Sequence, residues 1–228
     1  MLIGGFQKLT LLDFPGKVAC ILFTPGCNFR CPFCHNGGLV SHVDPSAFLT
    51  EGEVLSYLKK RAGLLDGIVV TGGEPLLQQG LEDFLSQVKS MGYAVKLDTN
   101  GSFPDRLKAI VEAGLADYVA MDIKNSPEKY PLTAGCESVS MEVINESIRY
   151  LLSGKVDYEF RTTVTAELHT PKDIEAIARQ IRGAKRYFLQ NFKDSGDLVG
   201  VGNSPVPAEM LSEMQKAAQD IVVEVMVR

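Results

Sequence analysis

Residues 18–36 read VACILFTPGCNFRCPFCHN, an apolar run that leads directly into a loop with three cysteines. The run has the length and composition of a buried strand. The loop places Cys27, Cys31 and Cys34 in the spacing C-x3-C-x2-C, and three thiolates on one short loop suit a soft-metal centre. The stretch therefore predicts the first strand of a sheet and a metal site at its carboxyl end.

Strand-like and helix-like segments alternate through the rest of the chain. Further apolar runs of strand length are expected at residues 67–71, 93–98, 117–124, 158–164, 185–190 and 221–227. Apolar residues repeat at helical spacing within residues 51–65, 77–88, 103–113, 144–152, 174–181 and 210–217. This alternation predicts an α/β fold in which helices cover a parallel sheet, either a doubly wound sheet or an incomplete barrel. No linker rich in proline, glycine or serine divides the pattern, so residues 1–228 are expected to form a single domain.

Composition narrows the class of protein. The chain has 228 residues, of which 45% are hydrophobic, as in ordinary globular proteins. It carries 23 Lys and Arg against 28 Asp and Glu, a formal charge of −5 with no basic run, which argues against a nucleic-acid partner. No apolar stretch is long enough to span a membrane, and residues 1–6 do not resemble a signal peptide. We therefore expect a cytoplasmic protein without nucleic-acid or membrane partners.

The chain has five cysteines, and clustered cysteines in a reducing compartment indicate metal or redox chemistry rather than disulfides. The two cysteines outside the loop are poor candidates for a fourth ligand, because Cys20 lies inside an apolar strand and Cys136 lies in a distant loop. A [4Fe–4S] cluster normally takes four cysteine ligands. Three local cysteines would therefore leave one iron open to an external ligand.

Two other metal sites fit part of the loop. Zinc could be held by the three cysteines and His35, but adjacent side chains rarely both reach one small ion. The run Cys31-Pro-Phe-Cys34-His35 also matches the C-x-x-C-H pattern of haem attachment. Haem attachment would leave Cys27 without a role.

The loop, with aromatic Phe33 before its last cysteine, resembles the signature of the radical S-adenosylmethionine (SAM) superfamily, and residues 71–75 (TGGEP) resemble its GGEP motif. The resemblance implies a partial (β/α)6 TIM-like barrel with a parallel sheet and helices outside. It also implies that Cys27, Cys31 and Cys34 hold a [4Fe–4S] cluster whose open iron chelates SAM. Reductive cleavage of SAM would then produce a 5′-deoxyadenosyl radical that abstracts hydrogen from a substrate, with no catalytic residues beyond cluster and cofactor.

The resemblance also implies contacts to SAM from the two motifs. Phe33 would lie near the adenine, while Gly72 and Gly73 would allow close backbone approach to the ligand and Glu74 would bind its amine. The alternatives are loop packing for Phe33 and, for the glycines, a turn that leads to a helix starting at Pro75.

Residues 98–101 (DTNG) and residues 121–124 (MDIK) resemble two segments of glycyl-radical activating enzymes. Asp122 and Lys124 are two apart on the expected strand, so they face one side and require pairing or a ligand there, unless the strand has already ended and both are solvated. The resemblance implies that Asp98, Asn100, Asp122 and Lys124 surround SAM. It further implies a monovalent cation near Asp98, Thr99 and Asp122.

Two later strand positions are also predicted contacts to SAM. Arg161, in the middle of its strand, could bind a carboxylate with two hydrogen bonds or pair with Glu159. Gln190 ends the next strand, where pyruvate formate-lyase activase has a histidine that contacts the ribose. His42 and His169 are expected to be surface residues.

Residues 5–17 (GFQKLTLLDFPGK), taken with the cysteine loop, resemble the longer type of anaerobic ribonucleoside-triphosphate reductase activating protein. This resemblance implies an enzyme that removes a glycine Cα hydrogen and installs a glycyl radical on that reductase. The expected partners are this glycyl-radical enzyme and a flavodoxin- or ferredoxin-type electron donor. The alternatives are activation of pyruvate formate-lyase or another glycyl-radical enzyme, and a radical SAM reaction on a small molecule. Activases with a ferredoxin-like insert are disfavoured, because the chain has no second cysteine cluster.

Overall fold

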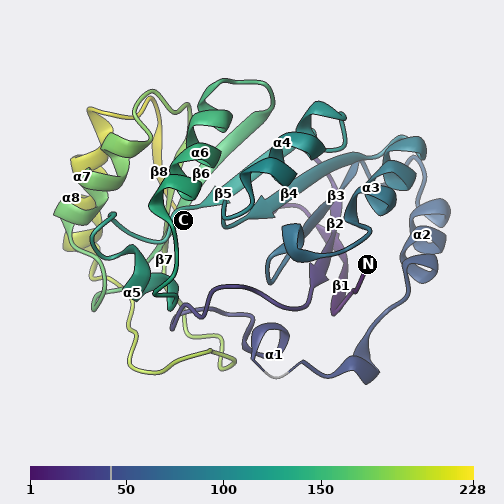
Figure 1. The fold of residues 1–228 in the computed structure, drawn as a ribbon, viewed down its shortest axis with the longest axis horizontal. Coiled ribbons are helices and arrows are strands. Elements are labelled where there is room, and N and C mark those ends of the chain that lie inside the picture. The colour runs from purple at the N-terminus through teal and green to yellow at the C-terminus, as the bar shows by residue number, and fades with distance from the viewer. Residues whose placement is uncertain (42) are drawn as a thin grey trace. The chain divides into compact units, whose positions relative to one another are not determined.

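The computed structural model describes residues 1–41 and 43–228 (Figure 1). His42 lies outside the described residues, so its predicted place at the surface stays a prediction. The chain divides into two compact units. Unit 1 comprises Met1–Cys27, Gly38–Thr99 and Asp105–Val119, and unit 2 comprises Asn28–Gly37, Asn100–Pro104 and Ala120–Arg228. The expectation of a single domain over the whole chain also stays a prediction.

Unit 1 holds the first strands of a mainly parallel sheet. β1 (Gly5–Thr10) runs antiparallel to β2 (Ala19–Thr24), and β2, β3 (Gly67–Gly72) and β4 (Ala94–Thr99) pair in parallel. β5 (Tyr118–Asp122) begins in this unit. The helices that lie wholly or mainly in unit 1 are α1 (Gly37–Val40), η1 (Pro45–Ala47), α2 (Glu51–Lys60), η2 (Pro75–Leu77), α3 (Leu81–Ser90) and α4 (Pro104–Glu112).

The core of unit 1 follows from apolar strands that are covered on both faces. Ile68, Val69 and Val70 of β3 are all fully buried, although alternate residues of a strand point to opposite faces. On one face, Phe14 from the β1–β2 loop packs with Ile21, Val69 and Tyr118. Burial on both faces thus accounts for the continuous apolar runs of these strands, and polar residues follow where the runs end.

Unit 2 holds the rest of β5 together with β6 (Asp157–Val164), β7 (Tyr187–Asn191) and β8 (Val225–Val227), and β6, β7 and β8 pair in parallel. Its helices are α5 (Tyr130–Ala134), α6 (Met141–Leu152), α7 (Pro171–Gln180) and α8 (Ala208–Gln219). α7 starts with Pro171 at the first helical position and a capping box between Thr170 and Asp173. α7 packs against α8 (Figure 1).

The predicted α/β fold class is confirmed, since neighbouring strands within each unit are also neighbours along the chain and helices connect the parallel ones. Three details differ from expectation. The run that begins at residue 18 forms the second strand, because β1, with half of its residues exposed, carries no continuous apolar pattern. β5 ends at Asp122 rather than at residue 124. β8 is limited to Val225–Val227 within the expected range 221–227.

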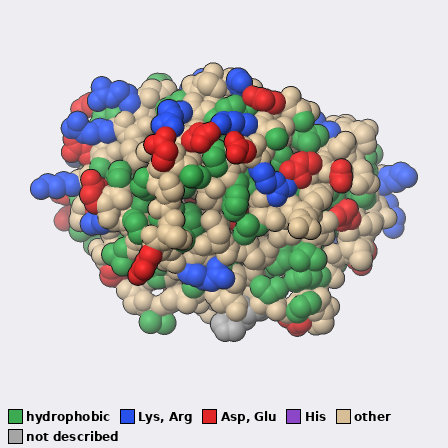
Figure 2. Space-filling view, viewed as in Figure 1, with side chains coloured by type: hydrophobic (Ala, Val, Ile, Leu, Met, Phe, Trp, Pro, Cys, Tyr) green, Lys and Arg blue, Asp and Glu red, His purple; other side chains and the backbone are tan. Residues whose placement is uncertain are grey.

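The surface agrees with the charge pattern of the sequence. In the face drawn in Figure 2, basic and acidic side chains are interspersed and no continuous basic patch is visible. Within residues 1–41 and 43–228, no helix combines the length and apolar character needed to cross a bilayer.

Candidate active site

In unit 1, the GGEP segment fixes the start of the cysteine loop. The parallel pairing of β2 with β3 ends at Thr24 and Gly72. Beyond it, the backbone N–H of Gly73 donates to the carbonyl of Thr24 (2.7 Å), and that of Glu74 donates to the carbonyl of Gly26 (2.8 Å). Backbone hydrogen bonds between the two segments therefore continue as far as Gly26, the residue before Cys27.

Glycine is required here by the chain's own backbone. A Cβ added to Gly73 would lie 1.9 Å from the carbonyl oxygen of Gly26, far inside any permitted contact. The sequence predicted that Gly72 and Gly73 allow close approach to a ligand. In the structure the close approach of Gly73 is to Gly26, and a contact of the two glycines with SAM stays a prediction.

Glu74 is buried and its carboxylate already organises neighbouring groups. Its Oε1 accepts hydrogen bonds from the backbone N–H of Leu76 (3.0 Å) and from Thr99 Oγ1 (2.8 Å). The first of these bonds caps η2, which starts at Pro75, so the predicted turn and helix start are confirmed. The proposed contact between Glu74 and the SAM amine stays a prediction.

Asp98, near the carboxyl end of β4, pairs with a lysine of its own strand. Lys96 Nζ lies 2.5 Å from Asp98 Oδ1, and the side chain of Lys96 is only 2% exposed. Lys96 was not singled out from the sequence. The available signal was a charged residue between the apolar residues Val95 and Leu97 of a predicted buried strand.

In unit 2, residues far along the chain hold the second part of the cysteine loop. The backbone N–H of Cys34 donates to the carbonyl of Cys31 (3.0 Å), which forms a turn between two predicted ligands. The N–H of Arg30 donates to the carbonyl of Ala134 (2.8 Å), at the end of α5. A Cβ on Gly135 would lie 2.2 Å from the Arg30 carbonyl, so this close approach also requires glycine.

A second contact in unit 2 comes from the loop before α8. The N–H of Gly200 donates to the carbonyl of Pro32 (2.9 Å), and that of Val199 donates to the carbonyl of Cys34 (3.3 Å). Sequence reasoning missed both anchoring segments, 134–135 and 199–200. A glycine after a short helix or within a loop is too common to identify such a partner.

The cysteine thiols have the donor chemistry that an iron–sulfur cluster requires. Within the described residues, no group of three or more His, Cys, Asp or Glu side chains is gathered closely enough to hold a metal ion. The ligand set Cys27, Cys31 and Cys34 therefore stays a prediction, supported by donor type and by the backbone bonds that hold each end of the loop.

Asp122, at the end of β5, accepts hydrogen bonds from two cations of unit 2. Arg161 Nε lies 2.7 Å from its Oδ1, and Lys124 Nζ lies 3.2 Å from its Oδ2. Burial by itself would raise the pKa of Asp122, but the Arg161 and Lys124 cations outweigh burial and hold that pKa far below its usual range. Asp122 was not among the partners predicted for Arg161, and the predicted contact of Arg161 with SAM stays a prediction. The strand ends before Lys124, but neither residue is simply solvated.

His169, expected at the surface, is buried at 1% exposure. Its Nδ1 accepts from the backbone N–H of Thr165 (3.2 Å), so Nε2 carries the proton and donates to the carbonyl of Lys124 (2.9 Å). Burial lowers the pKa of His169, which keeps the ring neutral. The expectation was wrong because the ring bonds to the backbone of Thr165 and Lys124 and packs against Phe33, which removes it from water.

Phe33 packs against His169. The two ring centroids are 6.3 Å apart in an edge-on arrangement, and Phe33 is buried. The structure thus shows the packing alternative for Phe33, and its place beside the SAM adenine stays a prediction.

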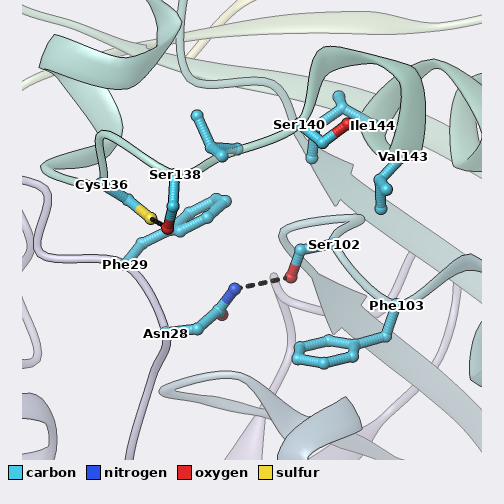
Figure 3. A pocket seen from close by; sticks show the side chains of 10 residues that line it. Asn28, Phe29, Ser102, Phe103, Cys136, Ser138, Ser140, Val143 and Ile144 are labelled. Atoms are coloured by element: carbon cyan, nitrogen blue, oxygen red, sulfur yellow. Dashed lines mark hydrogen bonds between the residues drawn. The ribbon is translucent and has the colours of Figure 1, made fainter.

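Asn100 braces the cysteine loop within unit 2. Its Nδ2 donates to Asn28 Oδ1 (2.9 Å), Asn28 Nδ2 donates to Ser102 Oγ (2.9 Å), and Ser102 Oγ donates to Asn100 Oδ1 (2.5 Å). This closed ring of hydrogen bonds borders a pocket of about 280 Å³, whose wall also includes Phe29, Phe103 and Cys136 (Figure 3). The predicted contact of Asn100 with SAM remains untested.

The remaining predicted residues lie as follows. Gln190 is half-buried in β7, in register with Thr163, and its contact with the ribose stays a prediction. Cys20 is buried, and burial raises the pKa of its thiol to about 12, as expected for an inert cysteine. Cys136 Sγ lies 3.5 Å from Ser138 Oγ. Burial lowers the pKa of His35, and Asp194 opposes this effect.

Comparisons with known proteins agree with the motifs. A family model described as the radical SAM superfamily matches residues 21–181. The whole chain is 31% identical to a candidate glycyl-radical enzyme activating enzyme of Methanocaldococcus jannaschii and covers 95% of it. The chain belongs to the radical SAM superfamily and, within it, to the glycyl-radical enzyme activating enzymes. It is therefore an enzyme of a family whose cofactors are a [4Fe–4S] cluster and SAM, and whose partners are glycyl-radical enzymes.

Other relatives match smaller parts. The pyruvate formate-lyase-activating enzyme of Staphylococcus aureus is 33% identical over 133 residues, which are 54% of this chain and 53% of that enzyme. Two solved structures share the fold. SuiB of Streptococcus suis bound to S-adenosylmethionine gives a TM-score of 0.69 at 12% identity over 91% of this chain and 51% of its own. A domain of a Bacteroides vulgatus pyruvate-formate lyase-activating enzyme gives a TM-score of 0.57 at 19% identity. The match covers 71% of this chain and 98% of that domain.

Proposed function

We propose that this enzyme installs a glycyl radical on anaerobic ribonucleoside-triphosphate reductase by reductive cleavage of SAM and removal of a glycine Cα hydrogen. The observation that carries the proposal is the cysteine loop, whose two parts are each anchored by backbone hydrogen bonds in their own unit. The full-length match to a candidate activating enzyme supports the reaction class. The resemblance of residues 5–17 to the reductase activators favours that partner.

The residues present fit the cluster and SAM. Cys27, Cys31 and Cys34 would hold the cluster, since thiolates are its usual ligands. When bound, the cluster and SAM together supply the radical that abstracts hydrogen. The protein's own residues bind and orient SAM and exclude water from it. The proposed contacts are Phe33, Gly72, Gly73, Glu74, Asp98, Asn100, Asp122, Lys124, Arg161 and Gln190.

Charge and burial suggest how some of these residues act. Asp122 stays ionised beside Arg161 and Lys124, so it accepts hydrogen bonds and does not exchange protons near neutral pH. Asn100 acts on the loop through Asn28, whose position it fixes by a hydrogen bond. These residues position the cofactor, and the reaction itself requires no proton transfer from them.

The resemblance also predicts a monovalent cation near Asp98, Thr99 and Asp122. Lys96 already supplies a positive charge to Asp98, which opposes a bound cation at that carboxylate. A flavodoxin- or ferredoxin-type protein is the proposed electron donor. The reducing cytoplasm, where thiols persist, is the proposed location.

Pyruvate formate-lyase is the alternative partner, because the chain shares 33% identity over 133 residues with an activating enzyme for it. The test incubates the anaerobically reconstituted, reduced enzyme and SAM with each purified partner and records the glycyl radical by electron paramagnetic resonance. We expect the radical on the reductase. A radical formed only on pyruvate formate-lyase would replace the partner assignment. Release of 5′-deoxyadenosine without a radical on either protein would instead favour a small-molecule substrate.

A further inference from the structure

The most unusual buried charge in unit 1 is Lys96 of β4. Its side chain is 2% exposed, while its neighbours Val95 and Leu97 are fully buried. Lysine is almost never buried unless it is paired, because removing an ammonium group from water is costly. The ammonium group lies 2.5 Å from Asp98 Oδ1. Residues two apart on a strand face the same side, so the pair forms within one strand.

Asp98 is the carboxylate near which the resemblance places a monovalent cation. Such cations bind oxygen ligands, and a carboxylate is usually the charged member of the set. Here the Lys96 ammonium already lies against that carboxylate, and Asp98 is only 12% exposed. A second positive charge at the same carboxylate would be repelled strongly, because little water screens the pair. The residues therefore do not fit a bound monovalent cation at Asp98.

We infer that the Lys96 ammonium is a built-in cation, which gives Asp98 the positive charge that a bound monovalent ion would otherwise supply. Asp98 then keeps its place and its hydrogen-bonding geometry without potassium or sodium. Lys96 acts through Asp98 and is a positioning residue. The inference rests on the proposed function, in which Asp98 contributes to the SAM site.

The test compares potassium, sodium and choline chloride at equal ionic strength, using the reconstituted full-length enzyme. The melting temperature and the SAM dissociation constant are both measured. For the wild type we expect no dependence on the cation, within about 1 °C and about two-fold. For Lys96→Ala in choline we expect a lower melting temperature and SAM binding weakened about ten-fold. Potassium should partly restore both, because the vacated space exposes Asp98 to the ion.

Two control variants are used: one separates the charge of Lys96 from its packing, and the other removes a different paired lysine. Lys96→Met removes the charge but fills the space, so it should lower the melting temperature without rescue by potassium. Lys89→Met removes another lysine of unit 1 that pairs with an aspartate, Asp117 at 2.6 Å, and should show no cation dependence.

Two results would overturn the inference. One is a wild type that binds SAM about ten-fold more tightly in potassium than in choline. The other is a folded Lys96→Ala variant that is indifferent to potassium. If that variant does not fold, the wild-type comparison decides alone. Neither measurement needs a partner enzyme, so failure of the glycyl-radical assay is a separate result.

Discussion

The two parts of the cysteine loop are held in different ways. In unit 1, the bonds from Gly73 and Glu74 continue the pairing of β2 with β3 past the end of the strands. In unit 2, the bonds come from segments 134–135 and 199–200, which lie about a hundred or more residues beyond the loop and belong to no recognised motif. One part is thus fixed by strand register and the other by the tertiary path of two loops.

This difference shows that a sequence motif marks only one of the two segments that hold the loop. The GGEP motif could be found from the sequence because it resembles a known family motif and follows a continuous apolar strand. The glycine at position 135 meets an equally strict steric demand, yet nothing around it marks the demand. Substitutions of one cysteine and of one glycine from each anchor test whether both parts matter equally.

The largest effect is expected from the thiols. Cys31→Ala, in the unit 2 part of the loop, should abolish binding of the cluster, because a methyl group cannot ligate iron. Iron and sulfide content and visible absorbance after anaerobic reconstitution measure the loss, and circular dichroism checks the fold. Cys136→Ala is the matched control and should retain a full cluster. Wild-type iron content in Cys31→Ala would exclude Cys31 as a ligand.

The glycines compare the two anchors directly. Gly73→Ala should lower the free energy of unfolding by more than about 2 kcal/mol, since its Cβ would lie 1.9 Å from the Gly26 carbonyl. Gly135→Ala should cost at least as much, because it adds the strain of φ +59° to a 2.2 Å contact with Arg30. Denaturant unfolding measures both losses.

The control for this pair is Gly52→Ala in α2, where the nearest atom is 4.0 Å away. Since alanine favours helices, this variant should be up to about 1 kcal/mol more stable than the wild type. A Gly135→Ala protein as stable as the Gly52→Ala protein would mean that the unit 2 anchor is dispensable.

A moderate effect is expected at Asp122. Arg161→Met removes one of its two cations, which should raise the pKa of Asp122 and lower the free energy of unfolding by about 1–2 kcal/mol, because the carboxylate is one third exposed and partly screened. An aspartate whose pKa is lowered by folding stabilises the protein above its unfolded pKa, and this is lost as pH falls through the folded pKa. In the variant that loss should be smaller and should be complete at a higher pH, because the folded pKa lies closer to the unfolded one.

Acid titration of unfolding stability measures the shift. Arg179→Met, which removes an exposed ion pair with Glu175 in the same unit, should leave the acid limb unchanged. An identical acid limb in the wild type and in Arg161→Met would contradict the pairing of Arg161 with Asp122.

The smallest effect concerns His169. Burial lowers the pKa of His169 below its usual value, so below about pH 6.5 the unfolded chain binds a proton that the folded chain does not. Stability should therefore fall with decreasing pH by up to about 1.4 kcal/mol per unit until the folded pKa is reached. His169→Gln should remove this slope while retaining a donor toward Lys124. Urea unfolding at several pH values measures it, and an unchanged slope would show that another group titrates.

The sequence was a good guide where signals are local. The parallel strands could be predicted from continuous apolar runs, and α7 from the helical spacing of the apolar residues within 174–181. It was a poor guide to β1, half of whose residues are exposed. It also missed the five-residue helix α5, which is too short to show the helical repeat of apolar residues. Asp122 and Arg161 were both predicted as site residues, but the hydrogen bond between them, which joins residues 39 apart in the chain, was not predicted. The burial of His169 could not be predicted, because the loop before α7 carries no pattern that sets its path.

By itself, the sequence determined the cysteine spacing and the alternation of strands and helices. These features are local: ligand spacing within a loop and burial along a strand depend on neighbouring residues. Only the tertiary structure decided that Lys96 is buried against Asp98 and that His169 hydrogen-bonds the carbonyl of Lys124. It also decided that segments 134–135 and 199–200 anchor the second part of the loop. Such contacts depend on the paths of distant loops, and no local pattern of residues specifies those paths.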